Sequence, residues 1–195
     1  MSLTVRKYID GIEYGTLFIA DDIDTESTYD SVKTQLSKAC ADGRIERIHH
    51  GIYHKPKYNE RLGTYIPCNI DSVAHIIARQ NGWHIIPGGD QCLNILGLST
   101  QVPSKYQYLS DGPYKTYDIQ GSRIEFKHRS PKNFPNYDLT AMIIQAICAH
   151  GKRNCDDAFI EKLSHSIPEK EKIPVMNNIG RPSAWIEEIM RKAFT

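Results

Sequence analysis

The sequence has no long apolar run, and this absence excludes membrane-spanning classes of protein first. A transmembrane helix needs about 18 or more consecutive apolar residues, and no stretch of the 195 residues approaches that length. The first eleven residues, MSLTVRKYIDG, also lack the apolar core of a secretion signal. We therefore expect a cytoplasmic protein with no membrane partner.

Paired cysteines are also missing. The five cysteines form no CxxC motif, and their number is odd. A zinc ribbon or a disulfide framework would require paired spacings. We interpret these cysteines as reduced thiols that mostly pack in a core. The His49-His50 pair and His54 have no cysteine or carboxylate at ligand spacing, and His50 would share a strand face with His54 only without a bulge. We expect no metal site.

No set of residues forms a clear catalytic constellation. The nearest approach is Asp118 followed by Glu125-Phe126-Lys127, which has the D…ExK order of metal-dependent nucleases. In such enzymes two carboxylates hold a divalent ion and the lysine helps to orient the attacking water. An amphipathic strand produces the same pattern, because alternation places Glu125 and Lys127 on one solvated face. We expect no enzyme and no cofactor, and a nuclease using Asp118, Glu125 and Lys127 is the alternative.

Charge is unevenly distributed, although the net charge is only +1. Residues 1–30 hold two Lys or Arg and seven Asp or Glu, whereas residues 31–61 hold seven and three, with three histidines besides. A local excess of positive charge is what a polyanion-binding surface requires. A solvated, charged hairpin would show the same excess, so charge by itself leaves both interpretations open.

Apolar spacing in the first 60 residues predicts a particular order of elements. The pattern indicates a helix at 3–12, a strand at 16–19, a short helical turn at 20–24, a helix ending near residue 41, and strands near 45–48 and 52–54. Thr28 is a candidate N-cap for the second long helix, and Gly43 follows its end. This order is that of a winged helix-turn-helix, which we predict over residues 1–60.

In a winged helix the last helix enters the major groove, and the ribbon lies against the backbone or the minor groove. The partner would be promoter or operator double-stranded DNA. Ordinary exposed helix positions and a purely protein-binding module are the alternatives, and the acids Asp21, Asp22, Asp24 and Glu26 count against DNA contact. The candidate DNA-binding residues are Tyr29, Ser31, Lys33, Thr34 and Lys38 on the helix, and Arg44, Arg47, His49, His50, Lys55 and Lys57 on the ribbon side.

The rest of the chain has the pattern of an α+β domain. The stretch YNERLGTYIPCN, residues 58–69, resembles a linker, and we place a domain boundary there, with the second domain at 66–195. Helices are expected near 71–81, 88–97, 138–150 and in two later segments, and strands at 83–87, 105–111, 115–119 and 123–129. The predicted class is α+β, with an N-terminal winged helix followed by a mixed α+β domain.

Two sequence blocks resemble a known family. The first is SVKTQLSKACADGRIERIHHGIYHKP, with Arg47 and Gly51-Ile52-Tyr53, and the second is LGLSTQVP, Leu96–Pro103, leading to Asp111-Gly112. They resemble the AbiEi-like antitoxins, bacterial winged-helix proteins of type IV toxin–antitoxin (abortive infection) systems. The resemblance covers nearly the whole chain. It rests mainly on the second block, because the ribbon pattern alone is weak.

The resemblance implies a transcriptional autorepressor whose C-terminal domain counters a nucleotidyltransferase-like toxin. Many of these proteins have an arginine in the recognition helix where this chain has Tyr29 and Lys38, so an operator sequence does not carry over. Ser99, Thr100 and Gln101 either satisfy backbone groups in a loop or form a partner or effector surface. Dimerisation or cooperative binding on DNA would suit a repressor, and the sequence leaves the oligomeric state open.

Overall fold

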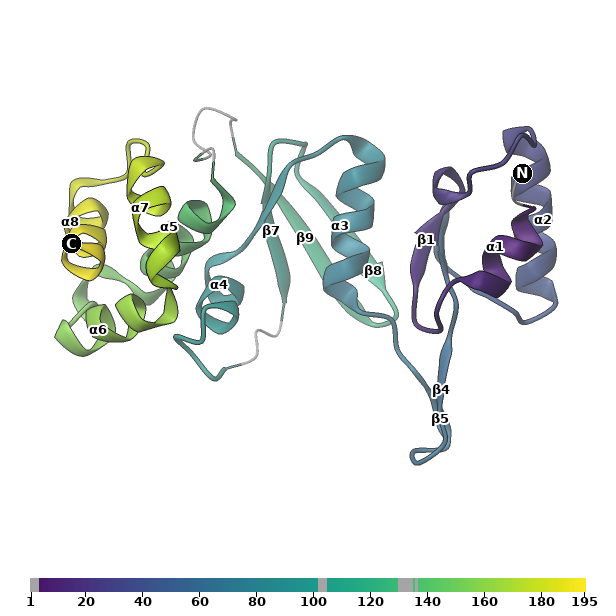
Figure 1. The fold of residues 1–195 in the computed structure, drawn as a ribbon, viewed down its shortest axis with the longest axis horizontal. Coiled ribbons are helices and arrows are strands. Elements are labelled where there is room, and N and C mark those ends of the chain that lie inside the picture. The colour runs from purple at the N-terminus through teal and green to yellow at the C-terminus, as the bar shows by residue number, and fades with distance from the viewer. Residues whose placement is uncertain (1–3, 102–104, 130–134, 136) are drawn as a thin grey trace. The chain divides into compact units, whose positions relative to one another are not determined.

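The computed structural model describes residues 4–101, 105–129, 135 and 137–195, and its class is α+β (Figure 1). The chain forms two compact units. The first runs to Asn81 and includes Asp118–Ser122, and the second contains Gly82–Tyr117 and Arg123–Thr195. The expected division at residues 60–66 therefore falls inside the first unit rather than between the two.

The first unit begins with the predicted order of elements and continues with a hairpin and a helix. Its elements are α1 (Val5–Gly11), β1 (Leu17–Ile19), the 3-10 helix η1 (Ala20–Asp22), α2 (Tyr29–Ala41), β2 (Glu46–His49), β3 (Ile52–His54), β4 (Lys57–Asn59), β5 (Thr64–Ile66) and α3 (Ile70–Asn81).

Local sequence explains where the first two α-helices begin and end. The hydroxyls of Thr4 and Thr28 accept hydrogen bonds from the backbone N–H groups of Lys7 and Ser31, which caps α1 and α2. Gly43 follows α2 with φ +69°, a conformation that glycine adopts without strain. The helix predicted to end near residue 41 is thereby confirmed.

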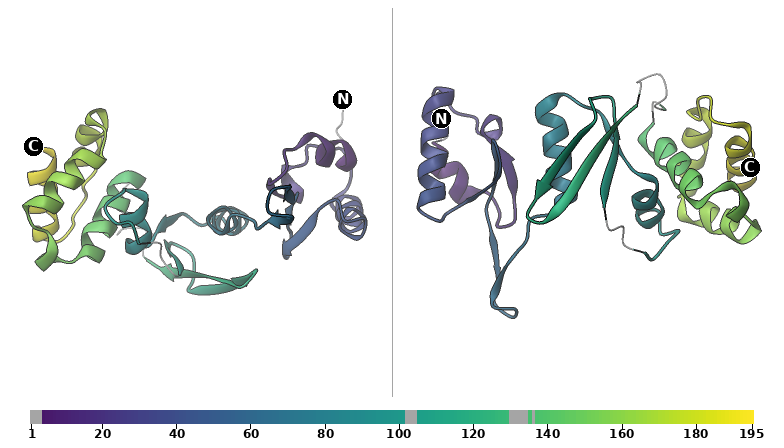
Figure 2. Two further views of the ribbon diagram at one scale, coloured as in Figure 1. Left: turned by 90° about the horizontal axis from the view of Figure 1, so that it is seen from below. Right: turned by 180° about the vertical axis from the view of Figure 1, so that it is seen from behind.

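A three-stranded antiparallel sheet in the order β1-β3-β2 supports these helices. Figure 2 shows α1 and α2 together on one side of that sheet in both views. Phe18 of β1 and Tyr53 of β3 stack with ring centroids 5.7 Å apart, and they belong to the core between sheet and helices. The other buried members of this core are Val5, Ile9, Ile23, Val32, Leu36, Ala39 and Ile45.

Lys55 is buried at the end of β3 and joins the sheet to α1. The side chain is only 7% exposed. Its Nζ donates to the carbonyl oxygens of Ile9 at 2.8 Å, Ile12 at 2.7 Å and Asp10 at 3.4 Å. These carbonyls lie at the C-terminal end of α1, where the helix dipole favours a cation. We expected Lys55 on the phosphate-facing surface, and that expectation is wrong because its ammonium is committed to α1.

His54 lies on the sheet face opposite Tyr53, because neighbouring residues of a strand point to opposite sides. Its side chain is buried, and among the described residues Nδ1 has no hydrogen-bond partner. Burial lowers the pKa of His54, and the carboxylate of Glu46, whose Oε2 lies 3.7 Å from Nδ1, opposes that shift. Burial is the larger cause, so we expect His54 to be neutral in the folded state.

The stretch predicted to be a linker is a hairpin instead. β4 and β5 pair antiparallel, with Tyr58 opposite Tyr65, and Gly63 in the turn has φ +62°. Only residues 55 and 56 separate β3 from β4. The chain then enters α3, which carries the buried residues Ile70, Val73, Ala74, Ile77 and Ala78.

The second unit combines a sheet with a set of helices. Its elements are β6 (Ile85–Pro87), α4 (Gly89–Ile95), β7 (Tyr106–Ser110), β8 (Lys115–Ile119), β9 (Ser122–His128), α5 (Asp138–His150), the 3-10 helix η3 (Lys152–Asn154), α6 (Asp157–Ser166), α7 (Glu169–Asn177) and α8 (Ala184–Phe194). The end of β8 and the first residue of β9, within Asp118–Ser122, are the part of this sheet that belongs to the first unit. The sheet order is β6-β7-β9-β8, with β6 antiparallel and β9 parallel to β7. None of the described helices is long and apolar enough to cross a membrane.

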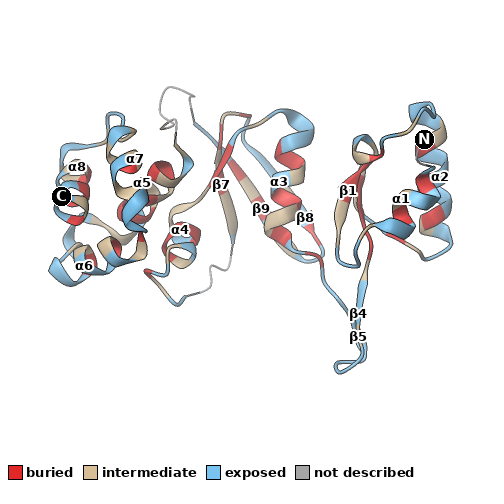
Figure 3. Cartoon of the chain, viewed as in Figure 1, coloured by how far each residue is buried: buried red, intermediate tan, exposed pale blue. Residues whose placement is uncertain are grey.

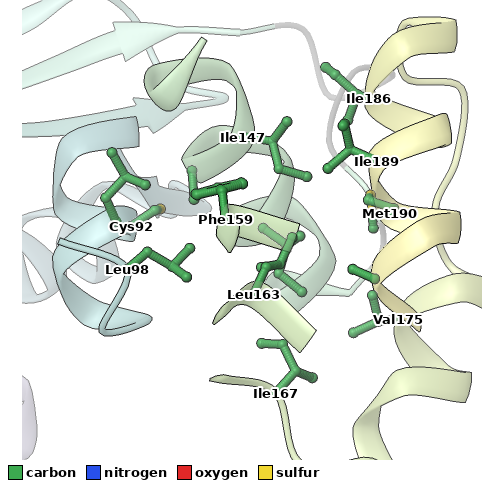
Figure 4. Close-up of a cluster of buried hydrophobic side chains, with 14 residues drawn as sticks. Cys92, Leu98, Ile147, Phe159, Leu163, Ile167, Val175, Ile186, Ile189 and Met190 are labelled. Atoms are coloured by element: carbon green, nitrogen blue, oxygen red, sulfur yellow. The ribbon is translucent and has the colours of Figure 1, made fainter. Parts of the chain in front are cut away.

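An apolar core joins the helices of this unit (Figure 4). Ile147 of α5, Leu163 of α6 and Met190 of α8 are fully buried in it. Cys92 of α4 lies in the same cluster, and burial raises the pKa of its thiol to about 12. Cys92 is therefore an inert packing residue, as we interpreted it. Figure 3 shows buried positions alternating with exposed ones along α5 and α8.

Lys55 supplies a first test of this architecture. Replacing Lys55 by Ala should leave the α1 carbonyls without their donor, at a cost of about 2 kcal/mol. Amide exchange in α1 and β3, followed by mass spectrometry, should then accelerate about 30-fold. The control is Lys57→Ala, since Lys57 is exposed and should leave exchange unchanged. Equal effects of the two substitutions would contradict the role of Lys55.

His54 predicts a pH dependence of stability. Because its folded pKa is lowered below the ordinary value of about 6.5, the unfolded chain binds the proton more readily. Stability from this group is complete above that value and declines as the pH falls below it. The midpoint of thermal unfolding should drop between about pH 7.5 and about pH 5.5, and His54→Gln should reduce the drop. His75→Gln, at a half-exposed histidine, should keep it; an unchanged drop in His54→Gln would refute the assignment.

Candidate nucleic-acid interface

The outward side of α2 carries most of the predicted helix residues. Tyr29, Lys33, Thr34 and Lys38 are exposed there, and Ser31 is half-buried. The Nζ of Lys33 lies 4.3 Å from the centre of the Tyr29 ring, so the two form a cation–π pair at the start of the helix. This face offers a phenol, hydroxyls and two ammonium groups, which are groups able to reach phosphates or base edges.

Two of the hydroxyls on this face are already engaged within the helix. The Thr34 hydroxyl donates to the Asp30 carbonyl at 2.9 Å. The Ser31 hydroxyl accepts from the Gln35 amide at 3.2 Å. The lysines are therefore the stronger candidates for contact with a ligand.

Arg47 of β2 joins this surface from the ribbon formed by β2 and β3. Its side chain is exposed, and its guanidinium donates to Nδ1 of His50 at 2.9 Å. The pKa of Cys40, near the end of α2, and that of Tyr53 are both raised by burial, and the Arg47 charge opposes the rise in each case. Arg47 thus lies close to Cys40 in the C-terminal part of α2.

The remaining ribbon residues are placed differently. Arg44 forms an ion pair with Asp10 of α1, so part of its charge is already compensated. A register shift lies between Arg47 and His49, and His49 is half-buried. Lys57 is exposed but belongs to β4, outside the ribbon. Lys55 is buried, as described above, and is withdrawn from the DNA-facing set.

Some acids of the first unit form ion pairs with arginines of the same unit. Asp10 pairs with Arg44, and Asp22 pairs with Arg79 of α3 at 2.8 Å. Asp24 and Asp30 are exposed beside the N-terminal part of α2. Asp42 is exposed at the C-cap of the helix, so exposed acids lie beside both ends of α2.

The residues of the nuclease alternative have partners of their own. Glu125 of β9 forms an ion pair with Arg123 at 3.2 Å and accepts a hydrogen bond from Gln107 at 2.9 Å. Lys127 donates to the other end of the Gln107 amide at 3.2 Å. Among the described residues, no group of three or more His, Cys, Asp or Glu could hold a metal ion.

The described part of the second block is residues 96–101, and hydrogen bonds within this loop and to Asn94 hold it. The Asn94 amide donates to the carbonyls of Ser99 and Gln101, and the Ser99 hydroxyl accepts from the Gln101 backbone N–H at 3.1 Å. Thr100 and Gln101 remain exposed. These contacts favour the backbone-satisfying role for the trio. Val102 and Pro103 lie outside the described residues.

The exposed side chains of the β4–β5 hairpin are not among the predicted site residues. Tyr58, Leu62, Tyr65 and Ile66 are all exposed there. Their signal in the sequence is the pair of short alternating segments KYN and TYI around a turn ending in Gly63. The surrounding glycine and prolines favoured the linker interpretation instead.

Comparison with known proteins gives a family and no further relatives. No curated protein and no solved structure matches the chain. One family model matches residues 4–175, which covers the first unit and most of the second. The chain therefore belongs to DUF6088, a family of unknown function.

Proposed function

We propose that this chain is a DNA-binding transcriptional regulator that acts in the cytoplasm. In this proposal the first unit works as a winged helix, with α2 in the major groove and the β2–β3 ribbon on the flanking backbone. The observation that carries the proposal is the placement of Lys33, Lys38 and Arg47. These three cations are all exposed, two of them on α2 and the third on β2.

Electrostatics favours a polyanion over a protein surface as the partner. Lys33, Lys38 and Arg47 are exposed, and two acids of the first unit, Asp10 and Asp22, are paired with arginines of the same unit. Such a surface would gain affinity from phosphate contacts and counterion release. Tyr29 and Lys33 at the start of the helix would supply contacts to base edges.

We further propose that the regulator is the antitoxin of a type IV toxin–antitoxin operon, which represses its own promoter. The support is the resemblance of Gly51-Ile52-Tyr53 and of the Leu96–Pro103 block to AbiEi-like antitoxins. The second unit would then counter a nucleotidyltransferase-like toxin. It has its own apolar core, distinct from the core of the first unit, so the two activities would reside in separate parts of the chain.

DNA binding predicts a specific response to salt. With DNA from upstream of the gene, Arg47→Ala and Lys38→Ala should each weaken binding and flatten the plot of log affinity against log salt by about one unit. Lys170→Ala removes an exposed cation from the second unit and should leave the slope unchanged. Fluorescence anisotropy at several salt concentrations measures the slopes. If all three variants match the wild type, α2 and the ribbon are not the interface.

The antitoxin proposal predicts that repression and protection separate in the full-length chain. The double variant Lys38→Ala, Arg47→Ala should lose repression of a promoter fusion. It should still protect cells that express a nucleotidyltransferase-like toxin encoded beside this gene, because the second unit is intact. Growth and reporter assays in one strain measure both. Loss of protection at normal protein levels would show that the two functions share a surface.

A further inference from the structure

The β4–β5 hairpin, residues 57–66, exposes several large apolar side chains. Tyr58 is 51% exposed, Tyr65 58% and Leu62, in the turn, 72%. An isolated two-stranded hairpin is marginally stable in water. In Figure 1 and in the right-hand view of Figure 2, the hairpin extends away from the helices and the sheet of its own unit.

The apolar side chains lie on both faces of this hairpin. Tyr58 and Tyr65 are directly opposite each other and contact edge to face, with ring centroids 5.2 Å apart. The next pair, Lys57 and Ile66, points to the other side, because the side-chain period of a strand is two. A flat partner surface would cover only one face. A groove would cover both, and a two-stranded ribbon fits a groove of B-form DNA.

The turn is organised to present two side chains outward. The Asn59 side-chain oxygen accepts hydrogen bonds from the backbone N–H groups of Arg61 at 3.0 Å and Leu62 at 3.2 Å. Both side chains are exposed at the tip. An exposed arginine beside an exposed leucine is the combination that DNA-bending proteins insert into the minor groove, the leucine as a wedge between base steps.

The attachment and charge of the hairpin favour the same partner as the ribbon. Lys55 N donates to Thr16 O at 2.9 Å and Gly15 N donates to Lys55 O at 2.6 Å, so pairing with the β1 strand continues to within one residue, Pro56, of β4. The hairpin carries two cations, Lys57 and Arg61, against one acid, Glu60. A second copy of the chain would present the same excess of positive charge, whereas DNA presents the opposite charge.

We propose that the β4–β5 hairpin is a second DNA-contacting arm that lies in a groove of the duplex bound by α2. Arg61 contacts phosphate, and Leu62 inserts as a wedge between base steps of the minor groove. The inference rests on the proposed DNA-binding function and adds to it a contact outside the helix and ribbon. It also predicts that the bound DNA is bent.

Three neighbouring substitutions test the arm by the sign of their effects. In the full-length protein, Arg61→Ala should weaken binding to upstream DNA and lower the salt slope by about one unit. Glu60→Ala, the matched control on the same turn, should strengthen binding. Leu62→Ser changes no charge, and it should weaken binding about tenfold and reduce the bend measured by energy transfer between dyes at the ends of the duplex.

The possible failures are distinguishable. If Lys38→Ala weakens binding but the three arm variants stay within about twofold of wild type, the arm proposal is wrong and the proposed function stands. If Leu62→Ser changes the sedimentation coefficient of the DNA-free protein and leaves affinity intact, the hairpin is a contact between copies, and the arm proposal is again wrong. If the wild-type chain binds no duplex DNA, the proposed function fails and the arm fails with it.

Discussion

The ammonium group of Lys55 donates hydrogen bonds to carbonyl oxygens at the C-terminal end of α1, and the geometry of the first unit depends on these bonds. Its hydrogen bonds to Ile9 and Ile12 hold the helix against the sheet at the point where the chain leaves β3. A buried charge is costly unless its donors are satisfied, so α1 has one favoured position on the sheet. α2 packs on the same apolar core, which fixes the exposed lysines of α2 relative to Arg47.

The candidate interface follows from this arrangement rather than from net charge. The chain is nearly neutral overall, yet Arg44 and Arg79 each pair with an acid of the first unit, while Lys33, Lys38 and Arg47 stay exposed. Intramolecular pairing thus decides which cations are available to a ligand. Glu125 is also engaged within the molecule. Its carboxylate pairs with Arg123 and accepts a hydrogen bond from Gln107, so a metal ion would compete with these two partners.

Local patterns in the sequence predicted most elements correctly, because spacing and capping act over a few residues. Val32 and Leu36 placed α2, with Thr28 as its cap and Gly43 beyond its end. Contacts between distant segments were harder to predict: nothing near Lys55 in the sequence indicates that its partners lie in α1, more than 40 residues earlier. β4–β5 was taken for a linker because Gly63 and Pro67 suggested one, and α7 was missed because it is short, polar and contains Pro174.

The inclusion of Asp118–Ser122 in the first unit affects the order in which the protein can be completed during synthesis. The thiol of Cys68 donates to the Gln120 side-chain oxygen at 3.2 Å, and Ile119 is fully buried. A ribosome must therefore synthesise β6, α4 and β7 before the first unit has all its parts. Domains usually fold as units in the order in which they emerge, but here the proposed DNA-binding half is completed only when much of the other half already exists. A nascent or prematurely terminated chain would lack this closing segment, which links the maturation of the first unit to translation well past Asn81.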